Sequence, residues 1–368
     1  MRFQYAGWDK QRESREKRLE RLTQLYRLLL NKFAGDADQA LEWLDRIAQR
    51  YGLWGEGIDR EAFEAMLRES GEVQRDARGA YSLTPRGESA MRNLALEEMF
   101  GDMAKLGGAG EHRSRHTGGG GEREPFTRPY AFGDDVWNLA AAPTISNAVQ
   151  SSLRRGEPDI NIREDDLVVY ENEQTTQCAT ALLVDCSHSM VLYGEDRMTP
   201  ARSVAMGLVE LVKRKFPRDR LHVIAFGDDA VEVPLPQVPY LSWGPYHTNT
   251  KAALEMARTM LLRSRCPNRQ VFMVTDGKPT VLDEGGRRLI DSGWLNRRIV
   301  NRTLDEAAQC RRKRIPITTF MMTDDPVLRR FVEELTELNQ GRAYYTGLGK
   351  LGATLLVDYI NNRRRSVR

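Results

Sequence analysis

The sequence predicts an α/β protein: a doubly wound, mostly parallel sheet preceded by a mainly helical N-terminal region. Three observations support this fold class. From about residue 177, short apolar runs typical of buried strands alternate with longer helical runs. Before residue 105, apolar residues recur at helical three-to-four spacing instead. A Gly-rich stretch separates the two patterns, as is usual between domains.

These patterns divide the 368-residue chain into four parts. We assign residues 1–105 to the helical N-terminal region and residues 106–130 to a Gly-rich linker. Residues 131–176 are expected to form a connecting segment with one helix near 143–155 and an extended stretch. Residues 177–368 then form the sheet domain.

The N-terminal region is predicted to hold three helices, a hairpin and a further helix. Gly52 is expected to end the second helix, and Asp59 could cap the third. Gly79 marks the hairpin turn, and the last helix begins near Pro85. This order resembles a winged-helix layout, and a helical adaptor that binds no nucleic acid is the alternative. The third helix, REAFEAMLRES, does not look like a surface rich in Arg, Asn and Gln that reads bases.

The sheet domain is predicted from the order of its strands and helices. The expected strands are 179–185, 220–227, 270–277, 315–322 and 342–346, with a short edge strand at 230–235. The expected helices are 200–216, 250–264, 303–314, 325–340 and 353–364. Near-continuous apolar strands separated by helices indicate a sheet that is covered on both faces.

The composition excludes several classes of protein. A hydrophobic fraction of 40% is enough for a full core, and a net charge of +3 gives no global electrostatic case for binding nucleic acid. Four cysteines without a C-x-x-C pair fit reduced thiols better than a zinc framework or a disulfide scaffold. The N-terminal stretch lacks an apolar signal-peptide core, and no apolar run approaches about 18 residues. We therefore expect a cytoplasmic protein without a membrane span.

Oxygen-bearing side chains follow the predicted strands where a ligand site is expected. The stretch ALLVDCSHSM, residues 181–190, ends a buried strand in a D-x-S-x-S pattern. Ligands of doubly wound folds bind at the carboxyl ends of the strands, so the acidic residues after two strands should share one rim. A turn that caps the next helix is the alternative for the D-x-S-x-S stretch. The oxygen-bearing residues in such positions are Asp185, Ser187 and Ser189 in this stretch, Thr248 just before a predicted helix, and Asp276 at the end of another buried strand.

Together these residues resemble the von Willebrand factor type A (vWA) domain and its metal-ion-dependent adhesion site. The resemblance covers about residues 177–368 and implies a Rossmann-like sheet. It assigns the D-x-S-x-S element to residues 185–189, the second element to Thr248 and the third to Asp276. One departure is that Tyr246 and His247, rather than glycine, precede Thr248, so a purely structural Thr248 is an alternative.

The ligand types fit Mg²⁺, or Mn²⁺, because both prefer oxygen ligands. Hydroxyls and one or two carboxylates would leave the ion electrophilic, with an open position for a carboxylate of another protein. His188 lies inside the motif, and its side chain is expected to point away from the hydroxyls. Since no histidine is placed as an evident general base, we expect a docking point and not an enzyme. A metal-dependent hydrolase is the less favoured alternative.

The resemblance extends to bacterial vWA proteins that work beside AAA+ ATPases of the MoxR or magnesium-chelatase type. It implies a metal-dependent adaptor whose partner is such an ATPase or its target, with no membrane and no nucleic acid involved. A DNA-binding or regulatory protein that acts through its N-terminal region is the other alternative. Residues 281–302, with Trp294, either border the metal rim and help to choose the partner or form a plain surface loop.

Overall fold

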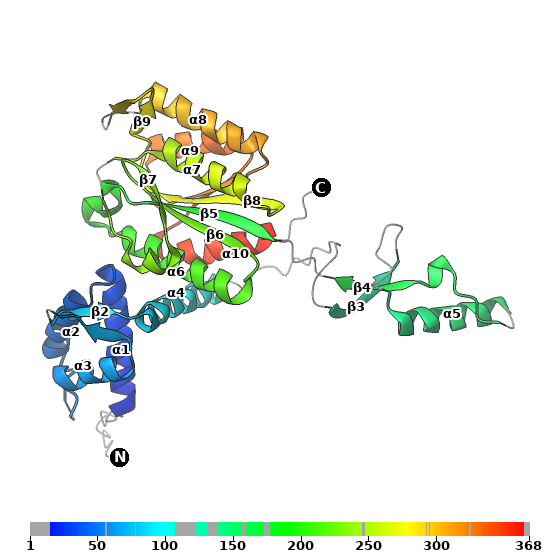
Figure 1. The fold of residues 1–368 in the computed structure, drawn as a ribbon, viewed down its shortest axis with the longest axis horizontal. Helices are drawn as coiled ribbons and strands as arrows, with labels where there is room; N and C mark the ends of the chain where they lie inside the picture. The colour runs from blue at the N-terminus through cyan, green and yellow to red at the C-terminus, as the bar shows by residue number, and fades with distance from the viewer. Residues whose placement is uncertain are drawn as a thin grey trace, which may run out of the picture. The chain divides into compact units, whose positions relative to one another are not determined.

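The computed structural model confirms the predicted α/β class. It describes residues 15–55, 57–77, 79–106, 123–130, 139–156, 159–172, 177–244, 247–291, 293, 295–323 and 325–363. A six-stranded sheet has the order β12-β11-β8-β5-β6-β7, and only its edge strand β7 runs antiparallel (Figure 1). Its strands are β5 (Cys178–Asp185), β6 (Arg220–Phe226), β7 (Ala230–Val233), β8 (Asn268–Thr275), β11 (Ile317–Met321) and β12 (Arg342–Tyr345).

Helices cover both faces of this sheet, as the apolar strands predict. Figure 1 shows α7, α8 and α9 on one face and α6 and α10 on the other. All eight residues of β5 are buried, and alternate ones such as Ala181 and Leu183 share a core with α7, α8 and α9. These helices are α6 (Met198–Lys215), α7 (Thr250–Arg263), α8 (Arg297–Arg312), α9 (Pro326–Asn339) and α10 (Leu351–Arg363).

The N-terminal region has the predicted order of three helices, a hairpin and a helix. Asp59 caps the third helix by accepting a hydrogen bond from Ala62 N, and Gly52 ends the second with φ 64°. Gly79, at φ 83°, lies in the hairpin turn. The elements are α1 (Arg15–Lys32), α2 (Ala37–Tyr51), α3 (Arg60–Glu69), β1 (Val73–Arg75), β2 (Tyr81–Leu83) and α4 (Pro85–Leu106).

The N-terminal region and the sheet domain pack into one compact unit through α4 and α6. Gly207 of α6 allows this close approach, because a Cβ there would lie 2.2 Å from the sulfur of Met99. Arg92 and Glu210, both buried, form a 3.4 Å ion pair across the same contact. Buried charges that are paired and hydrogen-bonded hold a contact in one arrangement, so the helical region is part of the framework of the sheet domain.

A second unit contains residues that the sequence divided between a linker and a connecting segment. Residues 123–129, which we placed in the linker, form β3 (Arg123–Pro129) and pair antiparallel with β4 (Val168–Asn172). The predicted helix is present as α5 (Ala141–Arg155). The hydroxyl of Thr144 accepts a 3.0 Å hydrogen bond from Val168 N and so joins α5 to β4. The expected linker is therefore shorter than predicted.

The segment after β8 also differs from its prediction. Within residues 281–302 the chain forms a hairpin of β9 (Val281–Glu284) and β10 (Arg287–Ile290), and α8 begins at Arg297 instead of near 303. Gly285 and Gly286, at φ 59° and 75°, make its two-residue turn. The segment is thus not a plain loop, and Trp294 lies outside the described residues.

Two further expectations concern cysteines and membrane spans. The four cysteines are buried thiols, and none forms a disulfide. Among the described helices, none is long and apolar enough to cross a membrane.

Candidate metal centre

The first part of the candidate site is the turn that follows β5. Asp185 ends the strand with no exposed surface, and its Oδ1 accepts a 2.9 Å hydrogen bond from Ser187 N. Cys186 N donates to Phe226 O at 2.8 Å, which holds the turn against β6. The hydroxyls of Ser187 and Ser189 lie 2.9 Å apart. Backbone bonds thus fix the turn and leave both serine hydroxyls on the same side as the carboxylate of Asp185.

The second part is the segment just before α7. Thr248 is 3% exposed, and its backbone is held by Thr280: Thr280 Oγ1 accepts from Thr248 N at 2.9 Å, and Thr280 N donates to Thr248 O at 2.9 Å. Asn249 caps α7 by accepting a hydrogen bond from Ala252 N. The hydroxyl of Thr248 is not used in these backbone bonds. Tyr246, part of the departure from the vWA pattern, lies outside the described residues.

The third part, after β8, brings the other two together. Asp276 Oδ1 accepts a 2.8 Å hydrogen bond from Ser189 Oγ. Gly277 then passes so close that a Cβ on it would lie 2.9 Å from Thr248 Oγ1, 3.0 Å from Asp185 Oδ2 and 3.1 Å from Ser189 Oγ. These oxygens come from the turn after β5 and from the segment before α7, and Asp276 of the third segment is bonded to Ser189. The five predicted ligands therefore lie together in one cluster.

Burial makes it costly in free energy to keep both carboxylates of this cluster ionised. Loss of water, followed by the nearby charge of Asp276, raises the pKa of Asp185 to about 7. Hydrogen bonds oppose the rise: Thr275 Oγ1 donates to Asp185 Oδ2 at 2.5 Å, and Ser187 N donates to Oδ1. Two buried carboxylates in one cluster require a compensating positive charge.

Arg197 is a site residue that the sequence analysis missed. Its Nη1 donates to Asp276 Oδ2 at 2.6 Å, and its Nη2 donates to Glu195 Oε2 at 2.8 Å. The Arg197 side chain is 11% exposed and that of Asp276 is fully buried. Nothing in the local sequence GEDRM distinguishes this arginine from a surface residue before a helix. Arg197 supplies one positive charge to a cluster with two carboxylates.

The donor set fits a hard divalent cation. In the described part of the chain, no three His, Cys, Asp or Glu side chains gather as a metal site, so a metal centre here must use hydroxyls. The cluster offers neutral hydroxyl oxygens beside two carboxylates, which is the ligand type that Mg²⁺ and Mn²⁺ prefer. The space that a side chain at position 277 would fill has three such oxygens within 3.1 Å, which suits a small cation.

The ring of His188, which lies between the two serines in the sequence, packs against Trp243, with centroids 5.6 Å apart. His247 contacts Asp228, with Nδ1 and Oδ1 2.7 Å apart. These contacts give both histidines partners outside the oxygen cluster.

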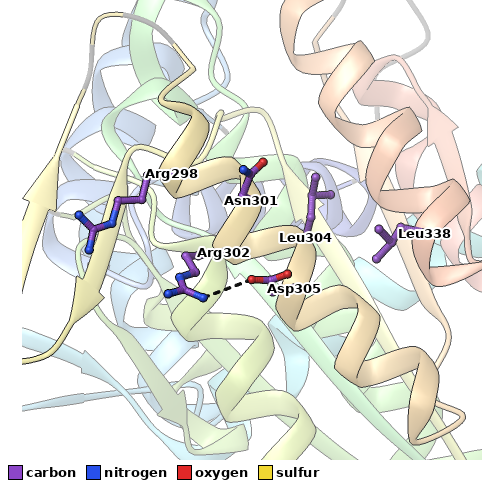
Figure 2. Close-up of a pocket in the computed structure, with 6 residues that line it drawn as sticks. All are labelled: Arg298, Asn301, Arg302, Leu304, Asp305 and Leu338. Carbon is purple, nitrogen blue, oxygen red and sulfur yellow. Dashed lines mark hydrogen bonds and ion pairs between the residues drawn. The ribbon is translucent and has the colours of Figure 1, made fainter.

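A groove of about 670 Å³ lies elsewhere on the sheet domain (Figure 2). Its lining is Arg298, Asn301, Arg302, Leu304, Asp305 and Leu338. Arg298 and Arg302 both pair with Glu284, at 2.7 and 2.5 Å. Figure 2 also shows the ion pair of Arg302 with Asp305. None of the five predicted ligands lines this groove, and its arginines are already paired, so the oxygen cluster remains the candidate site.

Comparison with protein families agrees with this fold. Residues 178–360 match the family described as Rv0959-like protein, vWA domain, and residues 122–172 match the one described as Rv0959-like protein, third domain. The sheet domain is therefore a vWA domain, and the chain is a vWA-domain protein. The second match falls on the small unit built around the β3–β4 pair.

Within this class the chain is similar to the uncharacterized protein Rv0959 of Mycobacterium tuberculosis. The two are 32% identical over 354 residues, which cover 94% of this chain and 51% of that protein. The uncharacterized protein Mb0984 of Mycobacterium bovis gives the same values. The chain thus spans about half the length of the curated relatives that it matches.

Solved structures give likenesses at low identity. Pilus adhesin SpaC from Lactobacillus rhamnosus GG is 15% identical, covering 53% of this chain and 32% of that one, with a TM-score of 0.42. The vWF domain of the pili tip protein Mfa5 from Porphyromonas gingivalis is 14% identical, covering 52% of this chain and 98% of that one, with a TM-score of 0.41. A von Willebrand factor type A structure from Catenulispora acidiphila is 13% identical, covering 53% of this chain and 44% of that one, with a TM-score of 0.39. The assignment to the vWA class rests on the family match.

Proposed function

We propose that this protein is a metal-dependent protein-interaction module. Asp185, Ser187, Ser189, Thr248 and Asp276 would hold Mg²⁺, or Mn²⁺, and the metal would bind an acidic residue of a partner. The observation that carries the proposal is the convergence of oxygens from two segments around the position of Gly277, with Asp276 of the third segment bonded to Ser189. When bound, the metal supplies a Lewis-acidic position for a carboxylate.

The charges in the site support an acidic partner. In the buried part of the site, a divalent cation, the two carboxylates and Arg197 together leave one net positive charge, while Glu195 pairs with Arg197 from an exposed position. The hydroxyl ligands neutralise none of it, so a carboxylate from outside would complete the balance. Because Asp185 and Asp276 are almost fully buried, the attraction acts in surroundings of lower dielectric than water and gains strength there.

The contacts of the site support binding over catalysis. Both histidines near the cluster have their own partners in Trp243 and Asp228. The hydroxyls of Ser187 and Ser189 bond each other, and Asp276, the carboxylate that accepts from Ser189, is bound by Arg197 through its other oxygen and would serve the metal rather than act as a free general base. A nucleophile needs such a base within hydrogen-bond reach. We therefore propose no hydrolase activity.

The partner that we propose is a MoxR- or magnesium-chelatase-type AAA+ ATPase, or its target, with this chain as a cytoplasmic adaptor. We propose this identity for the partner because the chain resembles bacterial vWA proteins that act beside such ATPases. The N-terminal region fits an adaptor better than a DNA reader. Its third helix, α3, carries Glu61, Glu64 and Glu69, and Glu64 is engaged by Arg60, Arg75 and Tyr81. With Arg60 and Arg68 set against these three glutamates, α3 lacks the excess of positive charge that contacts to phosphates use.

A metal-dependent pull-down tests the proposal. The full chain is used as bait for a purified MoxR-type ATPase, in millimolar Mg²⁺ and then in EDTA. We expect binding only with Mg²⁺, and none by Asp185→Ala or by the closer mimic Asp185→Asn. Asp305→Ala is the matched control, because Asp305 is an exposed aspartate in the groove of Figure 2. Binding that is indifferent to both EDTA and the Asp185 substitutions would refute the proposal.

A further inference from the structure

The metal face carries an exposed tryptophan that the proposed metal site does not use. Trp243 is 50% exposed, and its ring packs on His188, the residue between the two candidate serine ligands. Gly244 N donates a 2.8 Å hydrogen bond to Cys186 O, which joins the tryptophan loop to the D-x-S-x-S turn. The indole therefore lies beside the turn that would hold the metal.

We propose that Trp243 and His188 form an aromatic contact site that selects the partner. The partner segment would place a carboxylate on the metal and an apolar side chain, aromatic or aliphatic, on the indole of Trp243. This inference rests on the proposed function and adds the chemistry by which one acidic partner is distinguished from another. A solvent-exposed tryptophan on a binding face is the residue type most often found to dominate interface energies.

Hydrogen bonds to neighbouring helices hold the loop that carries Trp243 in place. Arg202, 2% exposed, donates to Leu241 O at 2.5 Å and to Asn31 Oδ1 of α1 at 3.1 Å. Tyr240 Oη donates to Glu88 Oε1 of α4 at 3.0 Å. Residues 240 and 241, three and two positions before the tryptophan, are thus held by α4 of the N-terminal region and by Arg202 of α6, which is itself bound to α1. A contact residue fixed in advance loses little conformational entropy on binding.

The spacing of the site restricts where the apolar side chain can lie in the partner. His188 is flanked in sequence by Ser187 and Ser189, and its ring centroid lies 5.6 Å from that of Trp243, so the indole lies within about three residue lengths of the metal ligands. An extended peptide rises about 3.3 Å per residue. The apolar residue is therefore expected one to three positions from the acidic residue. Lys278, next to Gly277, donates a 3.4 Å hydrogen bond to the neutral carbonyl of Gly293, and its positive charge favours an acidic segment further.

The test uses peptides displayed on phage, because several copies per particle compensate for weak single contacts. A random heptapeptide library is selected on the immobilised full chain in Mg²⁺ and eluted with EDTA. Wild type is expected to enrich peptides with Asp or Glu and an apolar residue one to three positions away. Trp243→Ala should still enrich the acid but lose the apolar preference, with peptide affinity falling on the order of tenfold.

Two controls keep the outcome clear. Trp43→Ala is the matched variant, because Trp43 is 44% exposed but stacks on Phe33 in the N-terminal region, and it should select as wild type does. Calorimetry should give the same Mg²⁺ affinity for Trp243→Ala and wild type. The role of Trp243 is refuted if wild type selects acidic peptides without an apolar preference, or if Trp243→Ala keeps the apolar preference. Either result leaves the proposed metal site standing. Peptides that lack an acid, or that EDTA does not release, overturn the proposed function and the inference together.

Discussion

Arg197 donates a 2.6 Å hydrogen bond to Asp276, a residue 79 positions further along the chain. The pair joins the segment before α6 to the end of β8 and places a fixed positive charge against one of the two carboxylates of the oxygen cluster. In this arrangement Arg197 neutralises Asp276 when no cation is present and repels a cation that binds nearby. The ion pair thus influences both the stability of the metal-free site and its affinity for metal.

Arg197→Gln is expected to bind Mg²⁺ about three- to tenfold more tightly than wild type, since one repulsive charge is removed near the ion. The same variant should be less stable without metal, because Asp276 loses its buried counter-charge. Calorimetry and thermal unfolding, each with and without Mg²⁺, measure both effects. Weaker Mg²⁺ binding by this variant would show that Arg197 chiefly holds Asp276 in place.

Gly277→Ala is expected to lower Mg²⁺ affinity by about tenfold or more, because its Cβ would lie within 3.1 Å of three candidate ligand oxygens. Gly293→Ala is the matched control: its nearest neighbour would be Asp291 Oδ1 at 3.7 Å, an ordinary contact. Titration calorimetry on both variants, with circular dichroism to check the fold, makes the comparison. Equal Mg²⁺ affinity for Gly277→Ala and wild type would mean that the ion does not bind at this point.

Thr248 can be tested for direct coordination without disturbing its backbone bonds to Thr280. Thr248→Val keeps the shape and removes the hydroxyl, so Mg²⁺ affinity should fall about tenfold, the effect of losing about 1.4 kcal/mol. Thr248→Ser keeps the hydroxyl and should stay within about threefold of wild type. If the valine and serine variants bind Mg²⁺ equally well, Thr248 is a structural residue.

Mg²⁺ affinity should depend on pH near neutrality. Burial and the charge of Asp276 raise the pKa of Asp185 to about 7, and the metal requires the ionised form. Affinity is therefore expected to rise about tenfold per pH unit between roughly pH 5.5 and 7 and to level off above. Calorimetry at four pH values from 5.5 to 8.5 measures this dependence. A flat profile across pH 7 would contradict it.

The raised pKa of Asp185 also makes the stability of the metal-free protein depend on pH. Between about pH 4 and 7 the folded state keeps a proton on Asp185 that the unfolded chain has released. The contribution of Asp185 to the free energy of unfolding therefore falls as pH rises through this window. Asp185→Asn should lack this contribution. The difference in free energy of unfolding between wild type and Asp185→Asn, taken at each pH, isolates it, because both proteins contain the same histidines.

Much of the fold could be predicted because its signals are local. The apolar run at β5, the caps at Asp59 and Gly52 and the alternation of strand and helix each lie within a short window of sequence. The β9–β10 hairpin also had a local signal, the pair Gly285 and Gly286, which the sequence analysis missed. The β3–β4 pair had none of this kind, because its strands are separated by α5 and more than thirty residues.

The sequence alone determined the parallel sheet and the order of the oxygen-bearing residues along its rim, because strand ends and helix starts are set by neighbouring residues. Only the tertiary structure decided that Arg197 neutralises Asp276 and that the tryptophan loop lies against the D-x-S-x-S turn. These contacts join Arg197 to Asp276, 79 positions apart, and Cys186 to Gly244, 58 positions apart. Their energies depend on burial and distance in space, which become defined only once the chain has packed.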